Sequence, residues 1–376
     1  MTMASILSKK ATRNNLITYG LILAAFLILQ TLSATGSLSS LFQGLLVPLC
    51  IYVILAVSLN LTVGILGELS LGHAGFMCVG AFTGAFFSVV VSETITASWI
   101  RFPLALLIGG LSAAVFGLLI GIPILRLRGD YLAIVTLAFG EIIKNLVNVL
   151  YIGIDSNGMH FSMKDAMSLN MEPDGKLIIN GAMGISDTPQ DSNFIVGALL
   201  VLLTVAIVLH MIHSRTGRAV MSIRDNRIAA ESVGINITKY KLIAFSTSAF
   251  LAGIAGVLYA HNLATLTPLQ NTFGYNGSIM ILVFVVLGGL GSVRGSMIAA
   301  IVLYILPELL RGLQNFRMLI YAIVLIIMMI FNSSPVFEGL REKLRLNHLL
   351  SGPRVQRLRE KLHISRKRNQ KGRGAE

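Results

Sequence analysis

Long apolar segments alternate with short polar ones along most of the chain. Each apolar segment has close to the ~20 residues that an α-helix needs to cross a bilayer. The pattern predicts about ten membrane spans, over residues 16–29, 44–64, 71–91, 103–125, 131–151, 194–212, 242–261, 278–292, 296–312 and 317–331. We therefore expect an all-α membrane protein with a polytopic domain over residues 15–331, between a short N-terminal segment, 1–14, and a C-terminal tail, 332–376.

The first apolar segment has two interpretations. Lys9, Lys10 and Arg13 precede it and Ser33-Ala34-Thr35 follows it, as in a cleavable signal peptide. An uncleaved first span is favoured, because it gives a consistent orientation to every span after it.

The overall composition separates this chain from soluble proteins. Hydrophobic residues make up 55% of it and charged residues 12%, whereas soluble domains carry about 25% charged residues. The net charge of +13 raises the possibility of nucleic-acid binding. The cations lie between apolar segments or in the tail, however, without interleaved aromatic residues. The pattern argues against nucleic acid and indicates contact with anionic membrane lipid.

The distribution of charge predicts the orientation in a cell inner membrane. Lys and Arg gather in the N-terminal segment, in the loop 213–241 and in the tail, whereas the loop 153–193 carries six acidic residues and two lysines. Because cytoplasmic loops are enriched in Lys and Arg, both termini and 213–241 are expected in the cytoplasm and 153–193 outside. Turn residues in the outer loop predict a small ordered cap with a hairpin around Lys176–Asn180.

The cytoplasmic loop 213–241 is long for a connector and has a helical pattern. Val220, Ile223, Ala230 and Val233 recur at helix-like spacing, between glycines at 217 and 234. We expect one short amphipathic helix held under the membrane by two spans. An ordinary basic connector is the alternative.

Glycine forms two dense clusters, over residues 64–75 and 288–295. Small residues allow membrane helices to approach closely, and that packing role is one interpretation. The other is a broken or re-entrant segment, since irregular backbone at membrane depth is tolerated only in protein or beside a cavity. The candidates for a pathway or gating role are Gly67, Ser70, Gly72, His73, Gly75, Gly288, Gly289, Gly291 and Ser292.

No catalytic or metal-binding motif is found in the sequence. It contains no GxxxxGK[ST] loop, no HExxH, no GxSxG and no cluster of Cys and His. Cys50 and Cys78 lie in apolar segments and are expected to be packing residues. The isolated histidines at 73, 210 and 261 are expected to be hydrogen-bonded structural residues. We expect no cofactor, no metal and no enzymatic activity in this chain.

Four segments resemble the permease subunit of branched-chain amino acid ABC importers, and the LivM type more than the LivH type. They are GELSLGHAGF (67–76), RLRGDYLAIVTLAFGEII (126–143), the segment 217–260 and LGGLGSVRGSMIAA (287–300). The resemblance implies a type II-like ABC importer permease, paired with a second, LivH-type permease. It also implies two cytoplasmic ATPase subunits, which would hold ATP and Mg, and an extracytoplasmic solute-binding protein.

The same resemblance assigns 217–234 as the segment that docks on the ATPases. In that family two alanines are followed four residues later by glycine, as at Ala229, Ala230 and Gly234, but Ile228 stands where the family pattern has Glu. The candidate coupling residues are Gly217, Arg218, Arg224, Asp225, Ala229, Ala230, Glu231 and Gly234.

Other functions stay open at the level of the sequence. Urea and short-chain amide importers have similar permeases, so the solute is less certain than the class of transporter. An ion-coupled secondary carrier buries ionisable residues in mid-membrane, whereas here such residues lie near span ends, which favours an externally powered permease. A channel and a membrane scaffold are further alternatives.

Overall fold

The computed structural model describes residues 3–36, 39–125, 127 and 129–333, and most of them are helical. It divides into two compact units, Met1–Gln314 and Asn315–Glu376. The second unit contributes α13 (Arg317–Ser333) to the described part. The predicted basic tail 332–376 lies almost entirely outside the described residues.

The long helices of the first unit follow the apolar segments of the sequence. They are α1 (Met3–Ala34), α2 (Ser40–Asn60), α3 (His73–Val91), α4 (Ser98–Ile124), α5 (Asp130–Asn148), α6 (Phe194–His213), α9 (Ile237–Ala260), α11 (Tyr275–Gly288) and α12 (Val293–Leu309). A six-residue π-helix, η1 (Leu61–Leu66), continues α2.

Six helices of the described chain are long and apolar enough to cross a membrane: Ser40–Leu66, His73–Val91, Ser98–Ile124, Phe194–His213, Ile237–Ala260 and Val293–Gly312. Three further apolar helices, Thr18–Ala34, Tyr275–Gly288 and Leu319–Ile330, are shorter. Helix α5 carries Asp130, Glu141 and Lys144, which lower its hydropathy. Each predicted span coincides with a helix, and the count of about ten spans stays a prediction.

Helix α9 lies in the core between α3 and α4, and glycine makes this packing possible. A Cβ on Gly80 of α3 would lie 2.4 Å from the Cα of Gly253 on α9. A Cβ on Gly256 would lie 2.1 Å from the carbonyl oxygen of Met77. Close backbone contact of this kind is how helices associate where no water drives them together.

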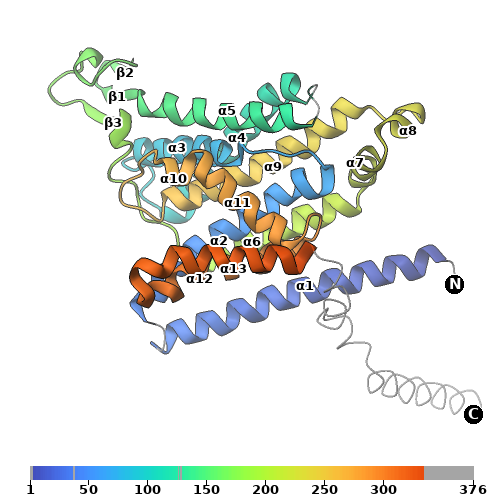
Figure 1. Cartoon of the computed structure of the whole chain (residues 1–376). Coiled ribbons are helices and arrows are strands. Elements are labelled where there is room, and N and C mark those ends of the chain that lie inside the picture. The colour runs from blue at the N-terminus through green and yellow to red at the C-terminus, as the bar shows by residue number, and fades with distance from the viewer. Residues whose placement is uncertain (1–2, 37–38, 126, 128, 334–376) are drawn as a thin grey trace, which may run out of the picture. The chain divides into compact units, whose positions relative to one another are not determined.

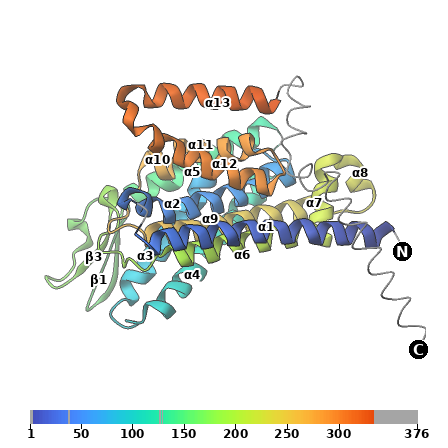
Figure 2. The same ribbon diagram turned by 90° about the horizontal axis from the view of Figure 1, so that it is seen from below.

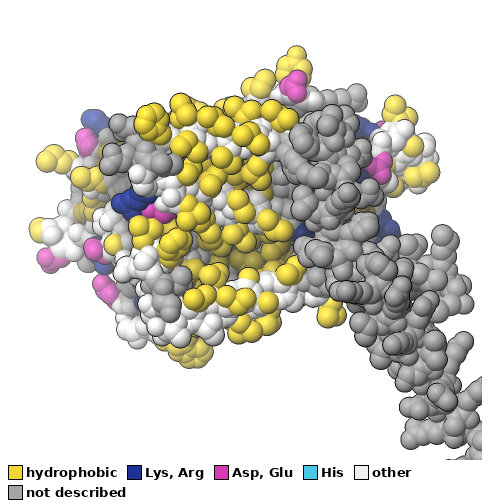
Figure 3. Space-filling model, turned by 60° about the horizontal axis from the view of Figure 1, so that its bottom comes forward, with side chains coloured by type: hydrophobic (Ala, Val, Ile, Leu, Met, Phe, Trp, Pro, Cys, Tyr) yellow, Lys and Arg dark blue, Asp and Glu magenta, His cyan; other side chains and the backbone are white. Residues whose placement is uncertain are grey.

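Hydrophobic side chains cover much of the outer surface (Figure 3). On α4 the exposed apolar residues include Leu107, Leu111, Val115, Leu119 and Ile122. A soluble protein rarely exposes so large an apolar area, so this surface is suited to lipid or to another membrane subunit.

The chain is not all-α, because the segment after α5 folds into a three-stranded antiparallel sheet in the order β2-β1-β3. Strand β1 (Tyr151–Asp155) pairs with β2 (Gly158–Ser162) on one edge and with β3 (Lys176–Asn180) on the other. The hairpin predicted around Lys176–Asn180 was therefore misplaced. The turn is set earlier, where the Oδ1 of Asp155 accepts from the backbone N–H groups of Asn157 and Gly158 at 2.9 and 3.1 Å.

The sheet lies at one end of the helices of the first unit, and two short helices, α7 (Arg215–Asp225) and α8 (Arg227–Ser232), lie at the other end (Figures 1 and 2). The segment after the sheet pairs with the loop that follows α9, where Ile185 and Leu266 exchange backbone hydrogen bonds of 3.0 and 2.8 Å. Helix α9 therefore runs from the α7–α8 end to the end that carries the sheet.

Candidate functional site

The predicted coupling segment forms two helices, not the single helix expected from its periodicity. Asn226 separates them with extended backbone (φ −155°, ψ 105°). Each helix start is capped by a side chain: Ser214 accepts from the N–H of Gly217 at 3.1 Å and Asn226 from that of Ala229 at 3.0 Å. Such caps satisfy N–H groups that a helix leaves unpaired at its first turn. The break between the two helices could have been predicted from the sequence, because Asn is a preferred residue at helix starts.

One face of this pair of helices is packed and the other is exposed. Val220 and Ile223 of α7 and Ala230 of α8 are buried. Ile228 and Val233 are 81% and 75% exposed. Both side chains are therefore accessible to a partner on the face opposite the packed one.

The predicted coupling residues divide between these two faces. Arg218, Arg224, Asp225, Ala229 and Glu231 are exposed, whereas Gly217 is buried. A Cβ on Gly217 would lie 2.2 Å from the carbonyl oxygen of Met211, so this glycine lets α7 turn tightly off α6. Gly234 has φ +84°, which makes the turn from α8 towards α9.

The first glycine cluster forms the end of η1 and an irregular segment before α3. Gly67 has φ +79° and follows the last residue of the π-helix. A Cβ on Gly72 would lie 2.1 Å from the carbonyl oxygen of Thr136, and one on Gly75 would lie 2.7 Å from the Cα of Gly140. This segment is therefore pressed against α5 along its backbone.

Polar groups lie buried around the start of α3. The Nε2 of His73 is 2.7 Å from the Oγ of Ser58, and the Oγ of Ser278 accepts from the N–H of Ala74 at 3.0 Å. The Oγ of Ser70 is buried without a hydrogen-bond partner among the described residues. His73 is thus hydrogen-bonded, as expected. The hydroxyl of Ser70 is the polar group here that can still form a hydrogen bond.

The second glycine cluster makes the turn between α11 and α12. Gly289 and Gly291 have φ +93° and +79°, a region that residues with a side chain rarely adopt. The Oγ of Ser292 accepts from the N–H of Gly295 at 3.2 Å and caps α12. Gly288 and Gly295 are in backbone contact, because a Cβ on Gly295 would lie 1.8 Å from the carbonyl oxygen of Gly288.

The two clusters, separated by more than 200 residues, meet in space. A Cβ on Gly64 would lie 2.2 Å from the backbone nitrogen of Gly291. The same nitrogen donates to the Oδ1 of buried Asn60 at 2.9 Å. Each cluster is visible in the sequence by itself, but no sequence pattern indicates their contact.

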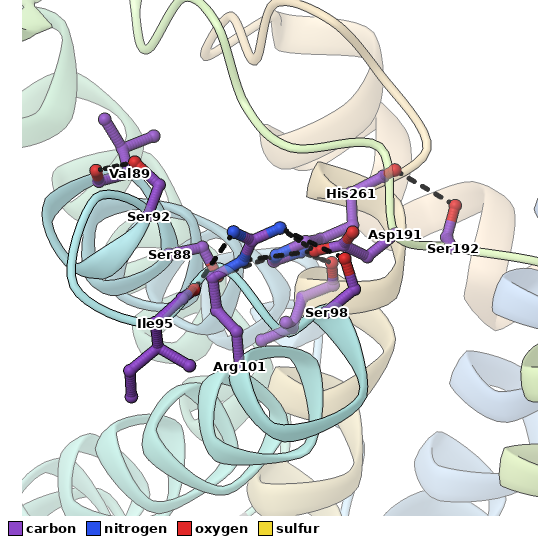
Figure 4. A network of polar contacts seen from close by, with 10 residues as sticks. Ser88, Val89, Ser92, Ile95, Ser98, Arg101, Asp191, Ser192 and His261 are labelled. Atoms are coloured by element: carbon purple, nitrogen blue, oxygen red, sulfur yellow. Dashed lines mark hydrogen bonds and ion pairs between the residues drawn. The ribbon is translucent and has the colours of Figure 1, made fainter.

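A network of polar contacts at the end that carries the sheet was missed at the sequence level (Figure 4). The guanidinium of Arg101 donates to the Oδ2 of Asp191 at 2.7 Å, and both side chains are at most 10% exposed. Beside them the Nε2 of His261 lies 2.8 Å from the Oγ of Ser88, and Ser192 donates to the carbonyl oxygen of His261 at 3.1 Å. The network links the segment before α6, which carries Asp191 and Ser192, to α3, α4 and α9.

Two more largely buried ion pairs occur, one between separate elements and one within α5. Lys241 of α9 contacts Glu68, in the segment after η1, and Lys144 of α5 lies 2.8 Å from Glu141 and contacts Gln270. Burial of one charge without its partner is costly, so such pairs hold their elements in register. Glu141 and Lys144 are three residues apart on one helix, a spacing that brings their side chains together.

Within the described part of the chain, no group of three or more His, Cys, Asp or Glu side chains is placed to hold a metal ion. Cys50 and Cys78 are buried free thiols. The chemical groups gathered here are glycine turns, serine hydroxyl groups and paired charges, not a catalytic or metal-binding set.

A family model described as "Branched-chain amino acid transport system / permease component" matches residues 41–331. The chain is 35% identical over 305 residues to the high-affinity branched-chain amino acid transport system permease protein LivM of Salmonella typhimurium, covering 79% of this chain and 70% of LivM. It is 28% identical over 286 residues to the fructose import permease protein FruG of Bifidobacterium longum, covering 73% and 75%. The LivH permease of Salmonella typhimurium is 26% identical over 129 residues, 34% of this chain and 41% of LivH. No solved structure matches significantly.

Proposed function

Because the chain belongs to the family of branched-chain amino acid transport permeases, we propose that it forms half of the membrane pathway of an ATP-driven importer of branched-chain amino acids. A second permease of the LivH type would form the other half. Two ATPase subunits would hold ATP and Mg, and an extracytoplasmic solute-binding protein would deliver the solute.

The observation that carries the proposal is the exposed face of α7 and α8. It presents Ile228, Val233 and Glu231 at the end of the helices opposite the sheet. The sequence has no nucleotide-binding loop of its own. In the proposed importer the energy for transport comes from a docked ATPase, and this face is the surface that the ATPase would contact.

The choice of solute rests on the degree of similarity. LivM is the relative that matches at 35% identity, whereas the sugar permease FruG matches at 28%. A branched-chain amino acid is therefore the favoured solute, and urea or a short-chain amide is the alternative. Hydroxyl groups and glycine backbone in the two clusters suit weak, reversible contacts with a zwitterion.

The buried charges argue against an ion-coupled carrier. Arg101, Lys144 and Lys241 are each paired with a carboxylate of the described chain. Proton-coupled carriers use Asp, Glu and His groups within the membrane as proton relays. The Arg101 and Lys241 pairs join separate segments and the Lys144 pair lies within α5, an arrangement that suits a structural role better.

The docking surface can be tested by co-purification from membranes that contain all subunits. We expect Ile228→Asp, which places a charge on the exposed apolar face of α8, to abolish recovery of the ATPase with the permease. Met167→Asp is the matched control, because Met167 is 92% exposed at the opposite end. Normal ATPase recovery with the Ile228 variant would reject this surface, and a wild-type chain that recovers no ATPase would reject the proposed function.

A further inference from the structure

The side chain of Arg224 links helix α7 to the first glycine cluster and, through Gly64, to the second. Three separate observations support this link. The first is the end of η1. Carbonyl groups in the last turn of a helix have no partner within that helix. The Nη1 of Arg224 donates to the carbonyl oxygen of Gly64 at 3.2 Å and so satisfies one of them.

The second observation is the path of the Arg224 side chain. Its aliphatic carbons lie over Gly67, since a Cβ on Gly67 would be 2.6 Å from the Cγ of Arg224. The Nε and Nη2 of Arg224 donate to the Oδ1 of Asp225 at 3.1 and 2.9 Å, which fixes the plane of the guanidinium. The aliphatic part of the side chain therefore packs on Gly67, and its guanidinium is hydrogen-bonded to Gly64 and Asp225.

The third observation is the position of Gly64 itself. Its carbonyl group contacts Arg224, and its Cα packs against the backbone nitrogen of Gly291. Gly64 thus lies between α7 and the turn before α12. Ile65, Met221, Arg224, Gly291 and Ser292 also line one shallow pocket, so the three elements converge there.

Helix α7 and η1 meet through a small set of apolar contacts. Val220 of α7 packs with Leu61, Ile65 and Leu66 of η1 and with Ala244 of α9. Non-directional packing allows α7 to slide or rotate against η1, whereas a charged hydrogen bond fixes distance and direction. Short π-helical turns occur frequently at functional sites.

We infer that Arg224 is the positioning residue that transmits movement of α7 to the glycine turn 289–292. The inference rests on the proposed function, in which an ATPase moves α7 and α8. When α7 moves, the guanidinium of Arg224 moves with it and shifts the carbonyl group of Gly64, to which it is hydrogen-bonded. Gly64 then displaces the backbone of Gly291, which packs against it. Arg224 then acts on coupling and not on docking.

The test uses the complete transporter with Arg224→Met, which keeps an unbranched stem over Gly67 and removes the donor. We expect the ATPase to co-purify normally and basal ATP hydrolysis to persist. Stimulation by solute and solute uptake should fall about tenfold, within the usual range of coupling between two sites. Arg215→Met is the control, because it removes a cation from the same helix and Arg215 makes no hydrogen bond to η1 in the described structure.

A second measurement follows the turn directly. Leu290 is 58% exposed in the turn and the two native cysteines are buried, so Leu290→Cys gives a single reactive thiol. We expect ATP to change its rate of modification in an otherwise wild-type transporter and to leave the rate unchanged when Arg224→Met is added.

Three outcomes would overturn the inference. One is normal solute stimulation with Arg224→Met. Another is loss of the bound ATPase from that variant, which would make Arg224 a docking contact and leave the proposed function standing. The last is a Leu290→Cys thiol that does not respond to ATP in the otherwise wild-type protein, a result that stands even if the Arg224 variant fails to fold.

Discussion

At Gly72 the lack of a side chain is a packing requirement and not a backbone one. Its φ of −101° is available to any residue, but a Cβ would lie 2.1 Å from the carbonyl oxygen of Thr136. Backbone cannot yield as the end of a flexible side chain can. At Gly67 and Gly291 positive φ adds a second constraint. Glycines within a single cluster, such as Gly67 and Gly72, are therefore required for different physical reasons.

Substitution of Gly72 gives a prediction at this scale. Gly72→Ala should destabilise the protein by about 1–3 kcal/mol, the usual cost of overpacking a tight site. Gly44→Ala is the matched control, because nothing lies within 4 Å of a Cβ there and Gly44 is within α2. The control should be neutral or stabilising by up to about 1 kcal/mol. Thermal unfolding of the purified protein compares them, and equal melting temperatures would show that the Thr136 contact is not restrictive.

Arg101 and Asp191 show what the sequence could not reveal. They are 90 residues apart, in different polar segments, and no spacing rule relates them. Glu141 and Lys144 were predictable as a pair because three residues bring two side chains to one face of a helix. Local chemistry is readable from the chain, whereas contacts between distant segments depend on the packing of whole helices.

Among the elements, the helices were more predictable than the strands and the short helices. Apolar segments of about 20 residues placed the long helices to within five residues, except for α1, which begins at Met3 and not at residue 16. The break at Asn226 was missed because Val220, Ile223, Ala230 and Val233 fit one continuous helix, and the capping preference of Asn was given no weight. The predicted hairpin was misplaced because Lys176–Asn180 is itself a strand, whereas the hairpin turn lies between Asp155 and Gly158.

The sheet should weaken in acid because of one carboxylate. Burial raises the pKa of Asp155, but hydrogen bonds from the backbone N–H groups of Glu172 and Asn157 and from His160 outweigh it and hold the pKa below its usual value. A group with a depressed pKa in the folded state stabilises the fold above the ordinary value of about 3.9. That contribution is lost as the pH falls through the lower folded value.

Hydrogen exchange of the 151–180 amides, measured at pH 7 and at pH 3, checks this expectation. Once corrected for the intrinsic pH dependence of exchange, protection should fall in acid. Asp155→Asn should reduce protection at pH 7 and flatten the change between the two pH values. Asp174→Asn is the control, since Asp174 is exposed in the same segment. If protection is as high at pH 3 as at pH 7, the Asp155 carboxylate does not stabilise the turn.

For the molecule as a whole, the sheet and the α7–α8 pair lie at opposite ends of the helices, so they should lie on opposite sides of the membrane. The bias of Lys and Arg predicts that α7 and α8 lie in the cytoplasm. We expect a cysteine at Met167, which is 92% exposed near the sheet, to react with an impermeant thiol reagent in intact cells. A cysteine at Val233, which is 75% exposed after α8, should react only after the cells are opened. Cys50 and Cys78 are buried and should give little background. The opposite labelling pattern would place α7 and α8 outside, where no ATPase could reach them, and would remove the basis for both the docking surface and the role of Arg224.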